Sequence, residues 1–398
     1  MKYLQSLLLA LAAVPSFAVA GTIPRAAETT TDVNPFLGKE FYANKGYAKK
    51  LEETISRFQN AGDTVNAARA RSIQKVGTFS WISSTADIAS IKPLIREANL
   101  HSLLAWKSQV VQLAVYNLPE RDCAAKASAG ELSLDDDGLN KYKAFIDKVA
   151  HELSSLEALP LTFAIILEPD SLGNVVTNLS VEKCAKAAPA YKEGISYAIK
   201  KLQQKNVHLY LDAAHGGWLG WDGNLAPTAE LFAEVLKGAG PGARVRGVAT
   251  NVSNYNQYNA TVREPYTEWN NAWDELHYAQ VLAPHLTAAG YPAHFIIDQG
   301  RSGQAGLRSE WGAWCNLKGA GYGIRPTTET NEPVVDAIVW VKPGGESDGT
   351  SDPTAARFDE VCAGPAAHIP APEAGSWFSD YVVELVQKAD PPIEPTFV

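Results

Sequence analysis

The sequence predicts an α/β fold, a single barrel of parallel strands surrounded by helices. Two observations lead to this prediction. Hydrophobic segments recur along the chain, each ending in a polar, aromatic or glycine-rich tip, and amphipathic helical patterns lie between them. Strands that alternate with helices form parallel sheets with right-handed crossovers. Because about seven such units fill the chain, a single barrel fits better than an open sheet.

Seven strands are expected. They cover residues 73–82, 109–116, 161–170, 207–212, 244–251, 293–298 and 336–342. Amphipathic patterns predict helices over 88–98, 138–155, 184–204, 228–237, 268–289 and 377–388. Barrels of this kind place their chemistry at the carboxyl ends of the strands. We therefore expect the polar strand tips to meet at one face.

The third strand, 161–170, ends at two carboxylates separated by a proline. Its apolar and β-branched residues indicate a strand buried on both faces. Pro169 cannot donate to a β-ladder and so presents Asp170 just beyond the strand end. Taken alone, Asp170 would more often cap the next helix. The other polar tips at the same predicted face favour acid chemistry instead.

The chain begins like a secreted protein. Residues 1–20 have a lysine, an apolar run and a small-residue cleavage site, which together indicate a signal peptide. We expect a lead-in over 21–35 and one large domain over 36–398. No later run reaches about 18 apolar residues, so no membrane span is expected. Glycosylation sequons occur at Asn178, Asn251 and Asn259; Asn251, at the end of a predicted buried strand, is the least expected to be modified.

Charge and cysteines narrow the class of protein further. The net charge of −9 argues against nucleic acid and anionic membranes as partners and is compatible with a neutral substrate. In a secreted chain, four cysteines predict two disulfides and allow three pairings. The pairing of Cys123 with Cys184 and of Cys315 with Cys362 would tie down two loops near the active face.

Tryptophan is abundant, with ten residues against a single methionine. Five lie at predicted strand ends or in glycine-rich loops: Trp81, Trp218, Trp221, Trp311 and Trp314. Flat apolar rings with a polar edge suit stacking against sugar rings. They would equally suit packing of the barrel mouth.

Several chemistries find no support. The histidines are scattered without metal-ligand spacing, and neither a nucleophile elbow nor a dinucleotide fingerprint follows a predicted strand. We therefore expect no metal and no cofactor. Carboxylates remain at the predicted face: Asp122, Asp170, Asp212, Glu346 and Asp348. Acidic pairs beside tryptophan are typical of glycoside hydrolysis.

Seven motifs carry a resemblance to a known family. They are YNLPERDC at 116–123, ILEPDSL at 166–172, LDAAHGGWLGW at 211–221, ATNVSNY at 249–255, DQGRSG at 298–303, WGAWC at 311–315 and WVKPGGESDGT at 340–350. In this order they resemble glycoside hydrolase family 6, the fungal cellobiohydrolase II group of cellulases. The resemblance, which runs from about Asn34 to the C-terminus, implies a distorted seven-stranded parallel β/α barrel, TIM-like, with loops that form an active-site tunnel. It also implies inverting hydrolysis of β-1,4-glucosidic bonds in cellulose and cello-oligosaccharides.

The resemblance also implies roles for residues. Asp170 is similar to the general acid, Asp122 to the partner that keeps this acid protonated, and Asp348 to the aspartate proposed as the base. Tyr116 matches a residue that crowds the distorted sugar, and Ser128 one that helps hold the water. We expect the substrate to contact Trp81, Ser83, Tyr116, Ser128, Asp212, His215, Trp218, Trp221, Asn254, Trp314, Lys342 and Glu346.

Some positions depart from the family pattern. Asn117 and Glu120 stand where the family usually has aspartate, and Asn117 removes a charge near Asp122. Ser83 replaces an aspartate that contacts sugar, and Ser347 replaces a cysteine. We recognise no cysteine-rich cellulose-binding module or linker in the sequence, which favours soluble or amorphous glucan as substrate.

The loops decide where a glucan chain is cut. Segments 119–137 and 344–372 resemble those that roof the cleft in the cellobiohydrolases. We therefore expect an enzyme that releases cellobiose from the non-reducing end. We also expect it to be secreted, extracellular and monomeric. An endo-β-1,4-glucanase of the same fold is the alternative, and a non-catalytic glucan-binding protein is a third hypothesis.

Overall fold

The computed structural model describes residues 33–397, and a compact unit begins at Pro35. The predicted signal peptide and nearly all of the predicted lead-in lie outside the described residues. No helix in the described part of the chain is long and apolar enough to cross a membrane.

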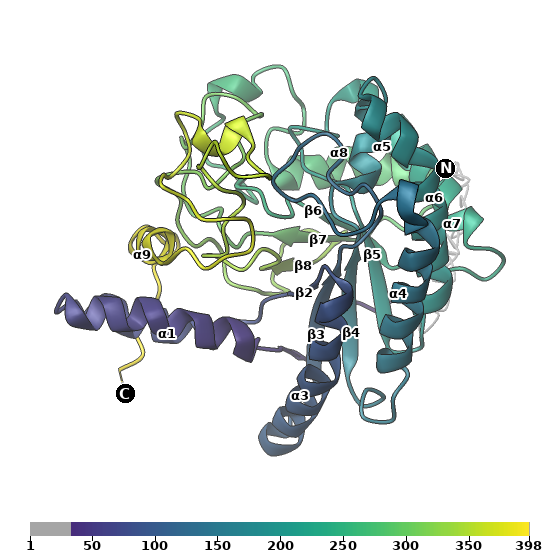
Figure 1. Cartoon of the computed structure of the whole chain (residues 1–398). Helices are drawn as coiled ribbons and strands as arrows, with labels where there is room; N and C mark the ends of the chain where they lie inside the picture. The colour runs from purple at the N-terminus through teal and green to yellow at the C-terminus, as the bar shows by residue number, and fades with distance from the viewer. Residues whose placement is uncertain (1–32, 398) are drawn as a thin grey trace, which may run out of the picture. The chain divides into compact units, whose positions relative to one another are not determined.

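A parallel sheet forms the centre of this unit (Figure 1). Its strands are β1 (Glu40–Phe41), β2 (Ser80–Ile82), β3 (Gln109–Val115), β4 (Thr162–Leu167), β5 (Val207–Asp212), β6 (Gly247–Thr250), β7 (Phe295–Asp298) and β8 (Val335–Val339). The order is β1-β3-β4-β5-β6-β7-β8. Both β1 and β2 pair with β3, β1 near its start and β2 near its end. Phe79 N–H donates to Trp340 O (3.0 Å), which brings the β2 side of the curled sheet to its β8 edge.

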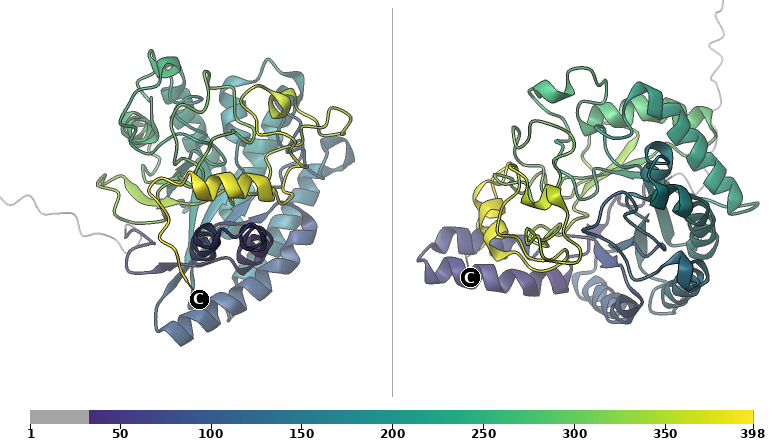
Figure 2. Two further views of the ribbon diagram at one scale, coloured as in Figure 1. Left: turned by 90° about the vertical axis from the view of Figure 1, so that its left-hand side faces the viewer. Right: turned by 45° about the horizontal axis from the view of Figure 1, so that its top comes forward.

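Helices surround this sheet (Figure 2). They are α1 (Lys45–Asn60), α2 (Thr64–Ile73), α3 (Ile91–Ala105), α4 (Gly138–Leu153), α5 (Ser171–Thr177), α6 (Glu182–Leu202), α7 (Asp222–Gly238), α8 (Glu275–Ala288) and α9 (Ser379–Gln387). Short 3₁₀ turns lie at η1 (Thr85–Ser90), η2 (Leu134–Asp136), η3 (Pro265–Thr267) and η4 (Glu360–Ala363). Figure 2 shows α1 and α2 side by side next to α9.

The core has layers on both faces of the sheet, because the strands are apolar on both faces. The outer layer packs the sheet against α3, α4, α6, α7 and α8. The inner layer fills the barrel with small and β-branched side chains, among them Val110, Ala164, Ile166, Ala249 and Val339, together with the rings of Phe36, Phe79 and Tyr210. A third cluster packs α1, α2 and α9 together.

The α/β barrel class and seven strand positions are confirmed, and the boundaries differ in places. The predicted strand 73–82 is wrong at its start, because Ile73 ends α2 and only Ser80–Ile82 pairs with β3. The predicted helix 268–289 begins at Glu275, where the Asp274 carboxylate caps it by accepting from His277 N–H (2.8 Å). The elements β1, α1, α2 and α5 were not predicted from the sequence.

Candidate active site

The strand tips meet around one cavity of about 610 Å³. The predicted catalytic residues Asp122, Asp170 and Asp348 all line it. So do the predicted substrate contacts Trp81, Tyr116, Ser128, His215, Trp218, Trp221, Asn254, Trp314 and Lys342. Ser83, Asp212 and Glu346 lie elsewhere, as described below.

The backbone at these tips is unusual. Non-glycine residues adopt left-handed φ angles at Glu120 (56°), Asp122 (58°), Glu168 (51°) and Asp170 (65°). Such conformations cost on the order of 1–3 kcal/mol each and persist where the surrounding structure fixes them. Burial and hydrogen bonds supply that fixation here, since the Glu168 carboxylate accepts from Asn117 N–H and Leu118 N–H (3.1 Å each). Glu168 thereby holds the segment after β3 against the end of β4.

Asp170 has the environment of an acid. It precedes α5, but its side chain makes no capping hydrogen bond, so the helix-cap interpretation is wrong. In the described part of the chain nothing donates a hydrogen bond to its carboxyl oxygens. Burial and the nearby carboxylates of Asp212 and Asp122 raise the pKa of Asp170 well above its usual range. The side chain is therefore held protonated at the cavity wall.

Asp212 lies behind Asp170 and does not line the cavity. Its Oδ2 accepts from Asp170 N–H (2.9 Å) and Ala214 N–H (3.2 Å). Burial raises the pKa of Asp212 to about 7. This location differs from the predicted sugar contact, because the side chain bonds the main chain of Asp170 beneath the cavity.

Asp122 sits on the loop after β3, beside the Cys123–Cys184 disulfide. Its Oδ2 accepts from Ser128 N–H (3.0 Å), which bends this loop over the cavity. Burial raises the pKa of Asp122, and the Ser128 N–H partly offsets the effect.

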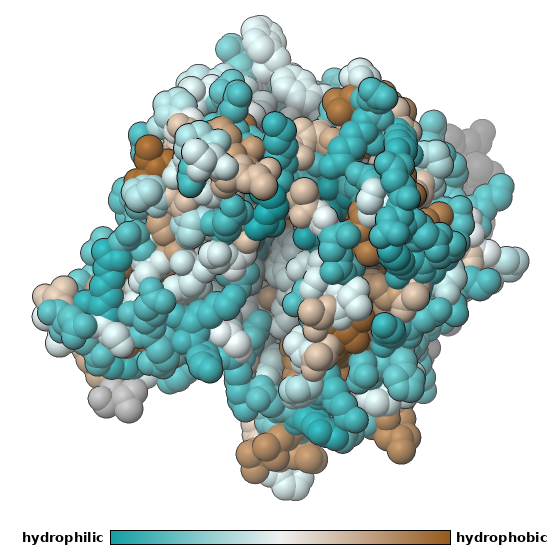
Figure 3. All heavy atoms as spheres, in the orientation of Figure 1, coloured by the Kyte–Doolittle hydropathy of each residue, from teal (hydrophilic) through white to brown (hydrophobic). Residues whose placement is uncertain are grey.

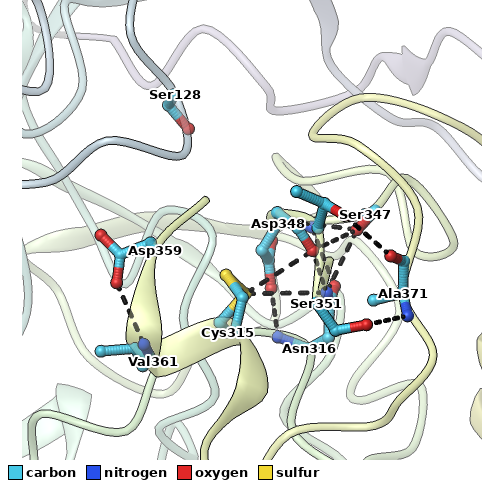
Figure 4. Close-up of a disulfide and its surroundings, with 12 residues drawn as sticks. Ser128, Cys315, Asn316, Ser347, Asp348, Ser351, Asp359, Val361 and Ala371 are labelled. Carbon is cyan, nitrogen blue, oxygen red and sulfur yellow. Dashed lines mark hydrogen bonds between the residues drawn. A yellow bond between two sulfur atoms is a disulfide. The ribbon is translucent and has the colours of Figure 1, made fainter. Parts of the chain in front are cut away.

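Asp348 has the opposite environment (Figure 4). Its Oδ2 accepts from Arg301 Nη1 (2.7 Å) and Asn316 N–H (2.8 Å), and Lys342 Nζ lies 3.5 Å from Oδ1. Although burial acts in the other direction, the nearby cations Arg301 and Lys342 lower the pKa of Asp348. The cavity therefore combines a carboxyl held neutral with a carboxylate held ionised.

The walls of the cavity are aromatic, and hydrogen bonds fix the indole rings. Trp81 Nε1 donates to Val341 O (2.9 Å), Trp218 Nε1 to Thr177 Oγ1 (2.7 Å) and Trp221 Nε1 to Gly217 O (2.9 Å). The Trp81 ring meets Tyr116 edge to face at 5.6 Å.

His215 is neutral in this wall. Its Nδ1 accepts from Gly217 N–H (3.2 Å), so the tautomer with a proton on Nε2 is present. Burial, with the Arg308 cation nearby, lowers the pKa of His215 to about 3. A neutral Nε2–H is a donor suited to a sugar hydroxyl.

Two contributors were not predicted from the sequence: Arg301, which neutralises Asp348, and Arg308, which donates to Asn254 Oδ1 (3.0 Å). Trp311, one of the five tryptophans named from the sequence, lines the cavity although no substrate contact was assigned to it. The DQGRSG and WGAWC motifs contain Arg301 and Trp311, so their motif positions were the available signal.

The two long loops meet above the cavity. The Cys123–Cys184 and Cys315–Cys362 disulfides confirm the favoured pairing. Lys126 N–H in the first loop donates to Asp359 Oδ2 in the second (3.2 Å), and Ala127 packs on the second disulfide. Figure 4 shows Asp359 and Ser128 on these two separate segments. We call this contact between segments 119–137 and 344–372 the roof.

The chemistry of the site is that of carboxylates. Within residues 33–397 no cluster of His, Cys, Asp and Glu could hold a metal ion. A parallel α/β barrel with a protonated carboxyl, an ionised carboxylate and tryptophan walls at its strand ends belongs to the glycoside hydrolase class of enzymes.

Comparison with known proteins gives the family. The sequence profile described as Glycosyl hydrolases family 6 matches residues 36–389, so the chain belongs to that family. It is 48% identical to Exoglucanase 3 of Agaricus bisporus over 90% of this chain and 79% of that protein. It is 47% identical to 1,4-beta-D-glucan cellobiohydrolase CEL6B of Podospora anserina over 96% of this chain and 90% of that protein.

Solved structures of the family share the fold. The crystal structure of CcCel6C, a family 6 enzyme from Coprinopsis cinerea, has a TM-score of 0.90 and 59% identity, covering 92% of this chain and 100% of that one. Cellobiohydrolase II (Cel6A) from Humicola insolens, in complex with glucose and cellotetraose, has a TM-score of 0.86 and 43% identity, covering 90% and 100%.

Proposed function

We propose that the protein is a secreted, inverting cellulase that releases cellobiose from the non-reducing end of β-1,4-glucan chains. The observation that carries this proposal is the Asp170 carboxyl, which has a raised pKa and no hydrogen-bond donor in a tryptophan-lined cavity. Named cellobiohydrolases among the relatives support the substrate, as does the cellotetraose bound to the Humicola insolens enzyme.

Asp170 is the general acid in this proposal. It gives its proton to the glycosidic oxygen as the bond from that oxygen to the anomeric carbon breaks. A water molecule attacks the anomeric carbon from the opposite face, which inverts its configuration. Burial keeps Asp170 protonated between turnovers, and the nearby carboxyl groups of Asp212 and Asp122 disfavour its ionisation further.

Asp348 is the ionised partner. It takes the proton of the attacking water, and its charge stabilises the oxocarbenium-like transition state. Because Arg301 and Lys342 hold its pKa low, Asp348 stays ionised in mildly acidic solution but is a weak base. The main-chain N–H that Ser128 donates to Asp122 places Ser128 beside the cavity, in agreement with a role in holding the water.

The aromatic walls provide binding energy away from the reacting bond. Indole rings fixed by hydrogen bonds lose little conformational freedom when a sugar stacks on them. Such remote binding energy can distort the reacting ring beside Tyr116. The neutral imidazole of His215, the amide of Asn254 and the ammonium group of Lys342 supply hydrogen bonds from the wall to sugar hydroxyls.

The roof supports exo action. Its loops touch through Lys126 and Asp359 and through Ala127 against the Cys315–Cys362 disulfide. A covered chain must enter by an end and thread, which favours repeated release of cellobiose. An endo-β-1,4-glucanase of the same fold remains the alternative for a roof that opens.

Replacing Asp170 with Asn tests the proposal. We expect kcat on cellotetraose to fall by about 10²–10⁴-fold, the usual contribution of a general acid. Binding of cellotetraose, measured by calorimetry, should stay within a few-fold of wild type because the aromatic walls are unchanged. Asp352→Asn, at an exposed carboxylate that accepts from Thr354 N–H, is the matched control and should keep full activity. Near-normal turnover by Asp170→Asn would refute the acid assignment.

A further inference from the structure

A second cavity of about 610 Å³ lies beside the catalytic cavity. Residues of α1, β2, η1 and α3 line it, together with Pro343 and Glu346 from the segment after β8. Trp81 lines both cavities. Ser83 and Glu346, which were predicted to contact substrate, line this second cavity and not the first. Figure 3 shows the surface hollowed between α1 and the rest of this face.

The charges of this second cavity suit a neutral polar ligand. Lys50 Nζ pairs with Glu346 Oε1 (2.7 Å), and Lys45 Nζ lies 3.7 Å from Glu97 Oε1. Both cations are therefore already neutralised by carboxylates. Asp87 forms no ion pair in the described part of the chain. An anionic ligand would meet an uncompensated carboxylate, whereas hydroxyl groups would find acceptors.

Asp87 is oriented for such a hydroxyl. Its Oδ2 accepts three hydrogen bonds, from Ser83 N–H (3.0 Å), Ser83 Oγ (3.3 Å) and Ser84 Oγ (2.9 Å). Its Oδ1 accepts none from any described residue. A carboxylate fixed through one oxygen presents the other as a strong acceptor whose orientation is already set.

We propose that the second cavity binds a further glucosyl residue of the same β-glucan chain, beyond the one held at Trp81, with Asp87 as its hydroxyl acceptor. The inference rests on the proposed function and adds one assignment: the two glucosyl residues that leave as cellobiose lie on the Trp81 side of the scissile bond. A linear glucan that continues past Trp81 enters the second cavity, since this residue belongs to both linings. Pro93 and Leu94 add apolar surface for a sugar face.

This arrangement has a consequence for the products. A chain that fills the second cavity places three glucosyl residues on the Trp81 side of the scissile bond. Its cleavage releases cellotriose, so cellotriose accompanies cellobiose as a primary product. A catalytic cavity that ended at Trp81 would give cellobiose alone.

Cellohexaose labelled at its reducing end separates these outcomes. Initial products of the full chain are resolved by chromatography, and the share of labelled cellotriose is measured against labelled cellotetraose. We expect labelled cellotriose from the wild type. Asp87→Ala should lower its share about tenfold, as expected for loss of a hydrogen bond to a charged group. The cavity-filling Leu94→Trp should also lower it, because the indole takes the space of the sugar. A share is independent of the amount of folded enzyme.

Asp63→Ala is the matched control, because Asp63 also accepts from a neighbouring main-chain N–H, that of Asn66, but lies in neither cavity. Its cellotriose share should equal that of the wild type. Labelled cellotetraose without labelled cellotriose from the wild type would overturn the inference and leave the proposed function standing. Equal shares in all variants would also overturn it. Absence of any hydrolysis would instead refute the proposed function.

Discussion

At the residue scale, burial and neighbouring charges set the protonation of Asp170 and Asp348. Burial and the nearby carboxyl groups of Asp212 and Asp122 raise the pKa of Asp170, whereas Arg301 and Lys342 lower the pKa of Asp348 against the effect of its burial. Two carboxyl groups whose environments push their pKa values apart are the arrangement that acid and base roles require. The assignment of acid and base therefore follows from contacts and not from residue type.

Asp212 should influence the pH dependence of kcat/KM through Asp170. Because its negative charge disfavours ionisation of Asp170, Asp212→Asn should lower the pKa of Asp170 and move the basic limb of the profile to lower pH. The Asn side-chain oxygen can still accept from Asp170 N–H. Glu275→Gln is the control, because it changes a buried carboxyl of similar pKa that is not among the groups raising the pKa of Asp170. The basic limb of the Glu275→Gln profile should therefore stay where it is in the wild type. A limb that stays in place or moves upward in Asp212→Asn would contradict the account.

Sequence reasoning at this scale worked where position alone was informative. Asp122, Asp170 and Asp348 were found because they follow predicted strands, and a common edge collects such residues. Arg301 was not assigned a role, since its partner Asp348 lies 47 residues away and the burial of the pair depends on the folded chain. Asp212 was placed in contact with sugar because sequence does not show which strand-end side chains turn beneath the cavity.

At the scale of elements, the roof joins two loops that are far apart in the sequence. Each loop is anchored by its own disulfide, and the hydrogen bond that joins the loops runs from Lys126 N–H to Asp359. Removing one such bond costs about 1 kcal/mol, which is enough to shift an equilibrium between closed and open roofs several-fold.

Replacing Asp359 with Ala should therefore increase internal cuts. We expect faster loss of viscosity of carboxymethyl cellulose per reducing end released, because an open roof admits chains without an end. Asp359 also accepts from Val361 N–H within its own loop (3.1 Å). Asp352→Ala serves as control, because the Asp352 carboxylate likewise accepts from a main-chain N–H of the second loop, that of Thr354, but makes no bond to the first loop. Equal viscosity loss in both variants would argue against a gating role of the roof.

Most elements were predicted because their hydrophobic periodicity is strong. The helices α1 and α2 were missed although Asn44 and Asp63 are cap residues of a recognisable kind. Ile73 was assigned to a strand because its apolar side chain fits either period; packing of α2 against α1 decided in favour of the helix. The two-residue β1 carries too short a pattern to be recognised.

At the scale of the whole molecule, buried carboxyls link folding to pH. Burial raises the pKa of Glu168, Asp212 and Glu275 to about 7 each. Their values in an unfolded chain are about 4. The folded state therefore binds more protons between these values, and the stability it gains below about pH 4 is lost as pH rises toward 7.

The midpoint temperature of thermal unfolding, followed by circular dichroism, should accordingly decrease as the pH rises from 5 to 8. Glu275→Gln removes one of the three groups and should make this fall shallower, because its amide does not titrate. An exposed substitution such as Asp352→Asn should leave the slope unchanged. A midpoint that rises across this range would show that the three buried carboxyls do not control the pH dependence.

The central claim is that Asp170 protonates the leaving oxygen while water attacks from the opposite face. Proton NMR of cellotetraose hydrolysis, recorded within the first turnovers and before mutarotation, tests it most directly. The account predicts that the new reducing end appears first as the α-anomer. A new reducing end that appears first as the β-anomer would mean retention through a covalent intermediate and would contradict the account.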